Sequence, residues 1–402
     1  MKDVKEIINL ERATSLLKDL VSIESPYFHE DEIMKFVYAW LEKAGLPATF
    51  HRYHEKKITN FKGLNVVGEL KGQQDGPTIV LNGHLDTVDL CDGWTKDPYK
   101  GIIEDGKLYG LGALDMKSGD TAILLALEAF RNSVEEFNGS ILYTFVSDEE
   151  GPYGLGTDAV ISDGLLSDSD IAIVPEPSAG FCEVEFPCLC LGARGGYNYT
   201  VTVKGRSAHA ATPEKGANAI TRAAKLMIAL EESEKVSHPK LGPGAIAIIR
   251  SEGGGAACSI PDKAEFTVFR HVTVGEELAT LRKEVAIAAE KAGIGDSYTL
   301  KFRDGPSPES AGFQPYIVSE SNPYTKTIKE SIQAVTGGTA NIAYFSSIGD
   351  FNYLGTRSRL PTYVFGAAGE NYHSADEYVV LDTVVDTARV IYDFLVRVLV
   401  NA

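Results

Sequence analysis

The sequence has few cysteines for its length, and their number is odd. The five among its 402 residues are Cys91, Cys182, Cys188, Cys190 and Cys258. Such a set argues against a disulfide framework and favours a reducing compartment, so we expect a cytoplasmic protein. Cys188 and Cys190 are separated by one residue, too close for the usual zinc-binding pair, and we interpret them as buried apolar residues.

Long apolar runs and positive charge are also scarce. No apolar stretch approaches the roughly 20 residues that cross a membrane. Residues 1–20 mix charged residues with Ile and Leu at helical spacing, unlike a secretory signal. The formal net charge is −18, from 38 Lys and Arg against 56 Asp and Glu. Phosphate backbones and anionic membrane surfaces would be repelled, which excludes nucleic acid and membranes as partners.

The chain is instead rich in alternating strand-like and helix-like segments. With 402 residues and 44% hydrophobic composition, it can bury a large core, and its length favours a division into two or three domains. Nearly continuous apolar runs at residues 78–81, 141–146, 171–174 and 362–365 are typical of strands buried on both faces. Residues 118–130 and 383–400 show helical periodicity. We therefore predict an α/β catalytic domain with a mainly parallel central sheet flanked by helices.

The middle third has a different pattern. Residues 197–203 and 266–269 alternate as half-exposed strands do, residues 217–232 and 276–292 suit helices, and residues 245–249 and 298–302 suit further strands. The order β-α-β-β-α-β predicts one compact α+β domain. We expect it to be inserted at residues 193–304, between catalytic segments 1–192 and 305–402. Turn-forming residues lie at both boundaries, in segments 192–196 and 304–308.

Acidic residues and histidines follow each predicted parallel strand. In open parallel sheets, ligands bind at the carboxyl ends of the strands. The residues at these ends are His84 and Asp86 after the first run, Asp148, Glu149 and Glu150 after the second, Glu176 after the third, and His373, Asp376 and Glu377 after the fourth. Asp115 precedes the helix that starts near Lys117, where an acidic side chain suits the cap position.

A single carboxylate at a strand end is usually a solvated loop residue, but the shared position of these residues indicates a site. Two imidazoles with several carboxylates and no thiolate match catalytic zinc, manganese or cobalt centres. His84 and Asp86 lie on one face at extended spacing, so we expect Asp86 to accept a hydrogen bond from the imidazole and to fix its tautomer.

Six segments, taken in order, resemble the M20 metallopeptidase and aminoacylase family, which includes acetylornithine deacetylase and succinyl-diaminopimelate desuccinylase. They read NGHLDTVD, YGLGALDMKSGD, VSDEEGPYG, VPEPS, GRSAHAATPEKGANAI and GENYHSADEYV. The resemblance spans almost the whole chain, and an ordered set of motifs is far more specific than any one of them.

The resemblance implies a centre with two divalent ions, zinc foremost, with cobalt or manganese as alternatives. One ion would be held by His84 and Glu176, the other by Glu150 and His373, and Asp115 would bridge both. Glu149 then corresponds to the general base. Two such ions polarise the scissile carbonyl and lower the pKa of a water, whose proton a carboxylate can take.

The resemblance further implies that the inserted domain is a lid through which a homodimer forms. His209 matches a lid histidine that stabilises the oxyanion in a neighbouring subunit. Arg194 and Arg270 are candidates for holding a substrate carboxylate, because a guanidinium group pairs with it through two hydrogen bonds. The implied substrate is an N-acyl amino acid or a short peptide, and the implied reaction is hydrolysis of its amide bond.

Three segments depart from the family's usual pattern. Gly110-Leu111-Gly112 lacks the usual central arginine, Cys258 stands where many members have asparagine, and Val268-Phe269-Arg270 replaces a frequent Asp-x-Arg. The last two changes affect expected substrate contacts, so the specificity of a particular member does not carry over.

Other readings remain open from the residues. A peptide substrate, as in the family's carboxypeptidases and dipeptidases, fits the same ligands. Glu176, in place of aspartate, resembles the deacylase and carboxypeptidase branches without separating them. A catalytically silent metal-binding relative is disfavoured by Glu149, because a metal store needs no base. A dinucleotide site is suggested only by Gly110 and Gly112, and its third glycine position is occupied by Asp115.

Overall fold

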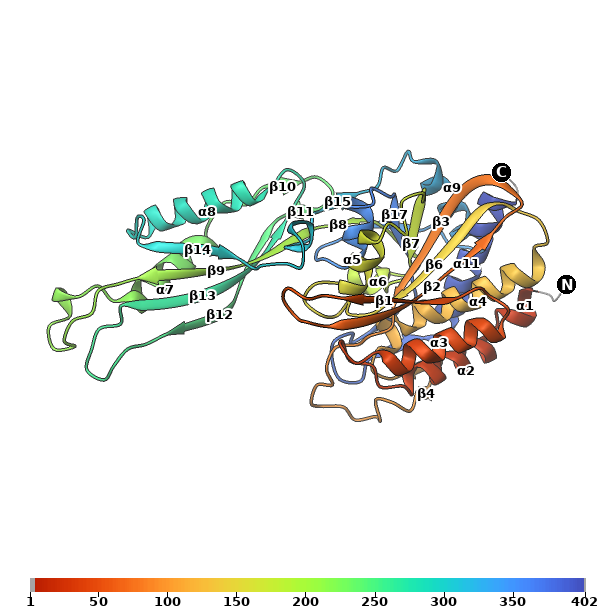
Figure 1. Ribbon diagram of the computed structural model, residues 1–402, viewed down its shortest axis with the longest axis horizontal. Coiled ribbons are helices and arrows are strands. Elements are labelled where there is room, and N and C mark those ends of the chain that lie inside the picture. Colours follow the sequence, from red (N-terminus) through yellow and green to blue (C-terminus); the bar gives the residue numbers. More distant parts are fainter. Residues whose placement is uncertain (1–3, 401–402) are drawn as a thin grey trace. The chain divides into compact units, whose positions relative to one another are not determined.

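The computed structural model describes residues 4–400, which form two compact units (Figure 1). Unit 1 comprises residues 4–193, 317–345 and 349–400, and unit 2 comprises residues 194–316 and 346–348. The inserted domain was expected at residues 193–304. Unit 2 extends beyond residue 304 because the backbone of Gly196 pairs with that of Phe313 through two hydrogen bonds.

A nine-stranded mixed sheet forms the centre of unit 1. Its strands, in spatial order, are β1 (Thr49–His54), β2 (Lys62–Lys71), β6 (Asn138–Val146), β3 (Gln74–His84), β7 (Ile171–Val174), β17 (Thr362–Val364), β8 (Cys188–Ala193) and β15 (Tyr316–Ile317), with β16 (Asn341–Phe345) beside β8. The four predicted parallel strands are β6, β3, β7 and β17, each parallel to its neighbour in that order. The predicted α/β fold with a mainly parallel core is confirmed.

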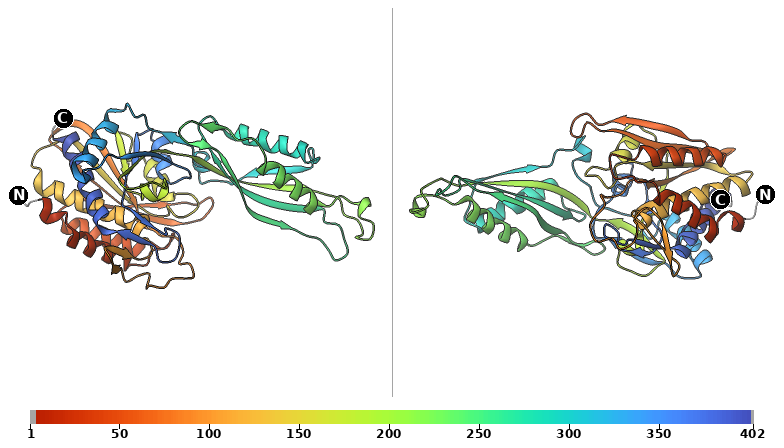
Figure 2. Two further views of the ribbon diagram at one scale, coloured as in Figure 1. Left: turned by 180° about the vertical axis from the view of Figure 1, so that it is seen from behind. Right: turned by 90° about the horizontal axis from the view of Figure 1, so that it is seen from below.

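Helices cover this sheet. They are α1 (Val4–Ile7), α2 (Leu10–Val21), α3 (Asp31–Lys43), α4 (Ser118–Ser133), α5 (Leu155–Ser162), α6 (Ser178–Phe181), α9 (Pro323–Thr336), α10 (Phe351–Thr356) and α11 (Leu381–Leu399). Helix α4 contains the predicted helical residues 118–130, and every one of them is buried. The amphipathic helix α11 packs against α4, and Figure 2 shows both from two further sides.

Short elements complete unit 1. A four-stranded sheet contains β18 (Gly369–Glu370), β19 (Tyr378–Val380), β5 (Lys107–Tyr109) and β4 (Ile102–Glu104) in that order. Unit 1 also contains the short helical turn η1 (Ala113–Lys117), whereas the turn η3 (Pro308–Ser310) belongs to unit 2. Strand β5 precedes η1, and β18 and β19 flank the loop that carries His373. This small sheet therefore joins two segments in which metal ligands were predicted.

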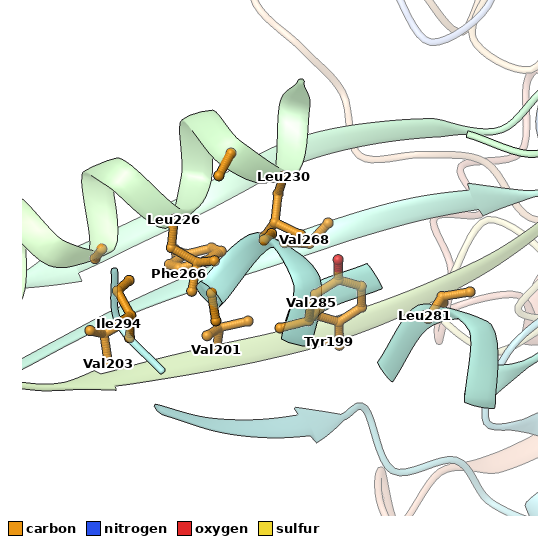
Figure 3. Packing of buried hydrophobic residues seen from close by; sticks show 14 of the residues in the cluster. Tyr199, Val201, Val203, Leu226, Leu230, Phe266, Val268, Leu281, Val285 and Ile294 are labelled. Carbon is orange, nitrogen blue, oxygen red and sulfur yellow. The ribbon is translucent and has the colours of Figure 1, made fainter. Parts of the chain in front are cut away.

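Unit 2 is an α+β sandwich with the predicted order of elements. They are β9 (Gly195–Lys204), η2 (Pro213–Lys215), α7 (Ala219–Glu231), the hairpin β10 (Ser237–His238) and β11 (Gly242–Pro243), β12 (Ala245–Gly253), β13 (Lys263–Val272), α8 (Leu278–Lys291) and β14 (Tyr298–Phe302). The antiparallel sheet has the order β12-β13-β9-β14. Its core forms where Leu226 and Leu230 of α7 and Val285 of α8 pack against sheet residues such as Phe266 and Val201 (Figure 3).

The burial of Cys188 and Cys190 agrees with their interpretation from the sequence. Cys188 and Cys190 are buried in β8, and all five cysteines are free thiols. Among residues 4–400, no helix is both long enough and apolar enough to cross a membrane.

Candidate metal centre

The predicted ligands of unit 1 lie at one edge of the central sheet. His84 is the last residue of β3, and it pairs in register with Val146, the last residue of β6. Glu149 and Glu150 therefore follow the strand beside His84. Glu176 lies two residues beyond the end of β7, the other parallel neighbour of β3. Because parallel strands end at the same edge, their following residues converge there.

Asp115 lies between the two imidazoles. Its Oδ1 is 3.3 Å from Nε2 of His84, and its Oδ2 is 3.4 Å from Nε2 of His373. The side chain is buried, with 5% exposed. One oxygen toward each imidazole is the arrangement that a carboxylate shared by two ions requires.

The local backbone explains why Asp115 faces the centre. Its φ of −114° and ψ of 98° are extended, although the surrounding residues form the turn η1. The expectation that Asp115 caps the next helix is wrong. Helix α4 begins at Ser118, and the residue before it, Lys117, makes no capping hydrogen bond through its side chain. The side chain of Asp115 lies instead between the two imidazoles.

The remaining candidate ligands form two groups around Asp115. Nε2 of His84 is 3.3 Å from Oε1 of Glu176. Nε2 of His373 is 2.9 Å from Oε1 of Glu150. The five residues that sequence analysis assigned as ligands are thus brought together, two on each side of one central carboxylate.

The donor set fits divalent cations. Ligand atoms lie within 4.8 Å of one another in two overlapping groups, His84 with Glu149 and Glu176, and His84 with Asp115 and Glu150. Oε2 of Glu176 is buried without a hydrogen-bond partner, as an oxygen reserved for a cation would be. Imidazole nitrogens and carboxylate oxygens without sulfur suit zinc, cobalt or manganese. Four carboxylates also carry the negative charge that two divalent ions neutralise.

These side chains shift one another's pKa. Burial opposes a charged imidazole, but hydrogen bonds to Asp115 and Glu150 raise the pKa of His373 to about 11. Burial likewise opposes the charge on His84, while Glu176 and Asp115 raise its pKa well above the usual value. Burial and the charge of Asp115 raise the pKa of Glu150 to about 7. Both shifts favour the protonated imidazole, whereas a ligand imidazole must be neutral, so cation binding and protonation compete at these two side chains.

Glu149 has one oxygen fixed and one directed to the centre. Its Oε1 accepts a hydrogen bond of 2.9 Å from the backbone N–H of Asp350. Its Oε2 lies 3.9 Å from Nε2 of His84. Burial, together with the charges of Asp350, Glu150 and Asp86, raises the pKa of Glu149 well above the usual value. A carboxylate with a raised pKa is a stronger proton acceptor than a solvated one.

Asp86 positions two neighbours of the centre. Its backbone carbonyl lies 3.1 Å from Nδ1 of His84, whereas its Oδ1 is 3.5 Å away, so the carbonyl rather than the carboxylate orients the imidazole. The carboxylate instead accepts hydrogen bonds from the backbone N–H groups of Glu149 and Glu150, at 3.1 and 2.8 Å. The expected tautomer control is therefore made by the main chain, and the side chain holds the backbone of Glu149 and Glu150.

Sequence reasoning missed the acids behind this loop. Glu30, at the start of α3, accepts a hydrogen bond of 3.0 Å from the N–H of Asp148. Asp350 accepts hydrogen bonds from Asn82 and Thr157, and its own N–H holds Glu149. Neither acid follows a predicted parallel strand at a short distance, and their full burial, at 3% and 1% exposed, has no signature in the sequence.

In unit 2, His209 lies in an exposed loop after β9. Its Nδ1 accepts a hydrogen bond of 3.1 Å from the N–H of Ala211. In the neutral imidazole this bond leaves the proton on Nε2, which is then a donor. An exposed imidazole that presents an N–H group suits the predicted role of stabilising negative charge.

The two candidate arginines have different surroundings. Arg194 is partly exposed, and it donates to the backbone carbonyls of Leu241 and Ser346. Arg270 is 1% exposed and forms ion pairs with Glu276 at 2.6 Å and Glu284 at 3.0 Å. Because the guanidinium of Arg270 is buried between two carboxylates, this geometry gives it a structural role and does not support direct contact with a substrate.

Taken together, a parallel-strand edge with two imidazoles and four carboxylates defines a metallohydrolase. Residues 80–397 match the model of peptidase family M20/M25/M40, and the chain belongs to this family. It is 26% identical over 378 residues to a succinyl-diaminopimelate desuccinylase of Sulfurovum sp. NBC37-1, covering 92% of this chain and 94% of that one. It is 30% identical over 317 residues to the protein of the same name from Methylobacterium radiotolerans, covering 76% and 77%.

Among solved structures, a tripeptidase from Staphylococcus aureus superposes with a TM-score of 0.80 at 21% identity, covering 98% of this chain and 99% of that one. At this identity the likeness shows that the two share the fold.

Proposed function

We propose that the protein removes the acyl group from an N-acyl amino acid by metal-dependent hydrolysis of the amide bond. The observation that carries the proposal is the position of Asp115 between two imidazoles, with the buried carboxylate of Glu149 beside them. The two relatives named succinyl-diaminopimelate desuccinylase support a deacylase over a peptidase.

In this proposal one ion is held by His84 and Glu176, and a second by Glu150 and His373, with Asp115 shared between them. Zinc is the proposed metal, with cobalt and manganese as alternatives. When bound, two such ions polarise the scissile carbonyl and make a water more acidic. The buried oxygen of Glu176 that lacks a partner supports its assignment as a ligand.

Glu149 is the proposed general base. Its Oε2 takes a proton from the attacking water, and the resulting carboxylic acid gives that proton to the leaving nitrogen. The N–H of Asp350 holds the other oxygen, and Asp86 holds the backbone of Glu149 itself. These bonds limit rotation of the side chain and so favour one orientation toward the water.

His209 and a homodimer complete the proposal. We propose that the dimer forms through unit 2 and that His209 donates from Nε2 to the oxyanion that develops in the partner's site. The fixed tautomer of this exposed imidazole supports such a donor role. The family resemblance supports the arrangement in which the donor comes from the other subunit.

Arg194 is the proposed ligand for the α-carboxylate of the substrate. Arg194 is partly exposed, in contrast to the buried Arg270. A net charge of −18 disfavours an anionic substrate at long range, so a local cation is needed. A free acid should therefore be preferred to its methyl ester, and Arg194→Ala should reduce that preference.

A substrate panel tests the proposed reaction. N-succinyl amino acids, N-acetyl amino acids and dipeptides are assayed with zinc, cobalt or manganese, with Glu149→Gln as a control for contaminating hydrolases. Cleavage confined to N-acyl amino acids supports the deacylase. Faster cleavage of dipeptides assigns the chain to the peptidases, and no cleavage despite bound metal assigns it a non-catalytic role.

The free thiols support the predicted cytoplasmic location.

A further inference from the structure

Glu377 binds the segment that carries Asp115. Its Oε1 accepts hydrogen bonds from the N–H groups of Leu114 and Asp115, at 2.8 and 3.0 Å, and its Oε2 accepts one from Gly112, at 2.9 Å. Its backbone carbonyl accepts a fourth, from the N–H of Gly110, at 3.0 Å. With 1% of its surface exposed, Glu377 is screened from water, so no solvent competes for these bonds.

The same residue ends the loop that carries His373. Three residues of this loop other than glycine, namely Asn371, His373 and Asp376, have positive φ angles of 66°, 58° and 56°. Residues other than glycine adopt this region uncommonly, although Asn, Asp and His do so more often than the others. The carboxylate of Asp376 accepts hydrogen bonds from Thr95 and Lys96, which anchors the loop on one side. Glu377 anchors it on the other.

We propose that Glu377 is a positioning residue that fixes Asp115 relative to His373. Asp115 lies in an extended conformation within η1, so regular helical hydrogen bonds do not hold its backbone. The carboxylate of Glu377 supplies acceptors for its N–H and for that of Leu114 instead. The inference rests on the proposed function in one respect, namely that Asp115 is shared by two ions.

The chemistry of the carboxylate makes the inference testable. A carboxylate only accepts hydrogen bonds, whereas the amide of glutamine must direct its NH₂ group toward one of the three donors. Glu377→Gln therefore removes at least one bond with little change in volume. Glu55 provides a matched control, because its buried carboxylate also accepts backbone N–H groups, from Lys57, Ile58 and Thr59, and none of these is a candidate ligand.

The experiment measures zinc affinity in the full chain by competition with a chromophoric chelator. We expect Glu377→Gln to bind zinc 10–100-fold more weakly, the range found for residues that orient ligands. Glu55→Gln should bind as the wild type does. At saturating zinc, kcat of Glu377→Gln should be lowered while KM is retained, since the substrate contacts are untouched. Backbone amide exchange at residues 112–115 should be faster in the variant without metal.

The outcomes separate this inference from the proposed function. Wild-type zinc affinity in Glu377→Gln, or an equal loss in Glu55→Gln, overturns the inference. If Glu377→Gln does not fold, amide exchange in the metal-free wild type decides: slow exchange at residues 112, 114 and 115 supports the bonds, and fast exchange refutes them. A wild type that binds zinc but cleaves no amide substrate refutes the proposed function and leaves the role of Glu377 intact.

Discussion

Replacing Arg270 by methionine should lower stability without changing recognition of a substrate carboxylate. Methionine keeps much of the length of the apolar stem and removes the charge. In unit 2 the guanidinium lies between Glu276 and Glu284, and the three side chains are 1%, 0% and 9% exposed. The substitution therefore leaves two buried carboxylates without their cation.

The expected loss of stability depends on the hydrogen bonds that the carboxylates of Glu276 and Glu284 keep in the variant. Removing one partner of a buried ion pair costs about 3–5 kcal/mol. Oε2 of Glu276 keeps the N–H of Thr273, and Oε1 of Glu284 keeps the hydroxyl of Ser233, so we expect the lower end of that range. For a domain of this size, about 3 kcal/mol lowers Tm by about 10 °C.

The assay combines thermal unfolding with kinetics. Differential scanning calorimetry should show the lower Tm in Arg270→Met, while the ratio of kcat/KM for a free-acid substrate and its methyl ester stays at the wild-type value. Arg250→Met is the matched control, because Arg250 lies in the same sheet and pairs with Glu252 while both are about 70% exposed. Its Tm should change little. An unchanged Tm with a reduced preference for the free acid would refute the reasoning and restore Arg270 as a substrate ligand.

Four further predictions concern the centre and one distant carboxylate. Zinc-reconstituted protein should hold two ions per chain by metal analysis, and Asp115→Ala should hold fewer. Glu149→Gln should keep both ions while kcat falls roughly 10²-fold or more. The His209→Ala homodimer and the Glu149→Gln homodimer should each be nearly inactive. Mixing the two variants should restore activity, because a mixed dimer holds one site with both functional groups; no recovery despite proven exchange of subunits would reject action in trans. Burial raises the pKa of Glu55, but the hydrogen bonds from backbone N–H groups outweigh it and lower this pKa to about 2. In urea unfolding, Glu55→Gln should therefore lose the full stabilisation by the carboxylate above pH 4.5, and its difference from the wild type should vanish toward pH 2.

The sequence predicts the ligands because their positions follow from one rule. His84 ends its parallel strand, Glu150 and Glu176 follow theirs within a few residues, and parallel strands end at a common edge. Asp115 and His373 do not follow from that rule alone. The sequence puts His373 beyond the fourth predicted strand and Asp115 before a predicted helix, but their places in the structure come from η1 and from a loop with left-handed residues.

The burial of Arg270 could have been predicted. Along β13, Phe266, Val268 and Val272 share one face, and the alternation of a strand puts Arg270 on the same face. The resemblance to a substrate-binding position directed attention to its charge instead. A charged residue in register with core residues requires buried partners of opposite charge, and Glu276 and Glu284 supply them.

Acidic residues near this centre have two functions, and the strand-end pattern does not separate them, because it marks Asp86 and Glu377 as well as candidate ligands. Three of the candidate ligands, His84, Glu150 and Glu176, lie at or just beyond the ends of parallel strands. Acids that hold the backbone, such as Glu30, Asp86 and Glu377, accept N–H groups of the loops between strands, and their partners are set by tertiary structure. These N–H dipoles partly offset the negative charge of carboxylates packed beside other carboxylates. The cluster can therefore keep an excess of negative charge for cations only while its loops remain ordered, and this links the order of the loops to the affinity for metal.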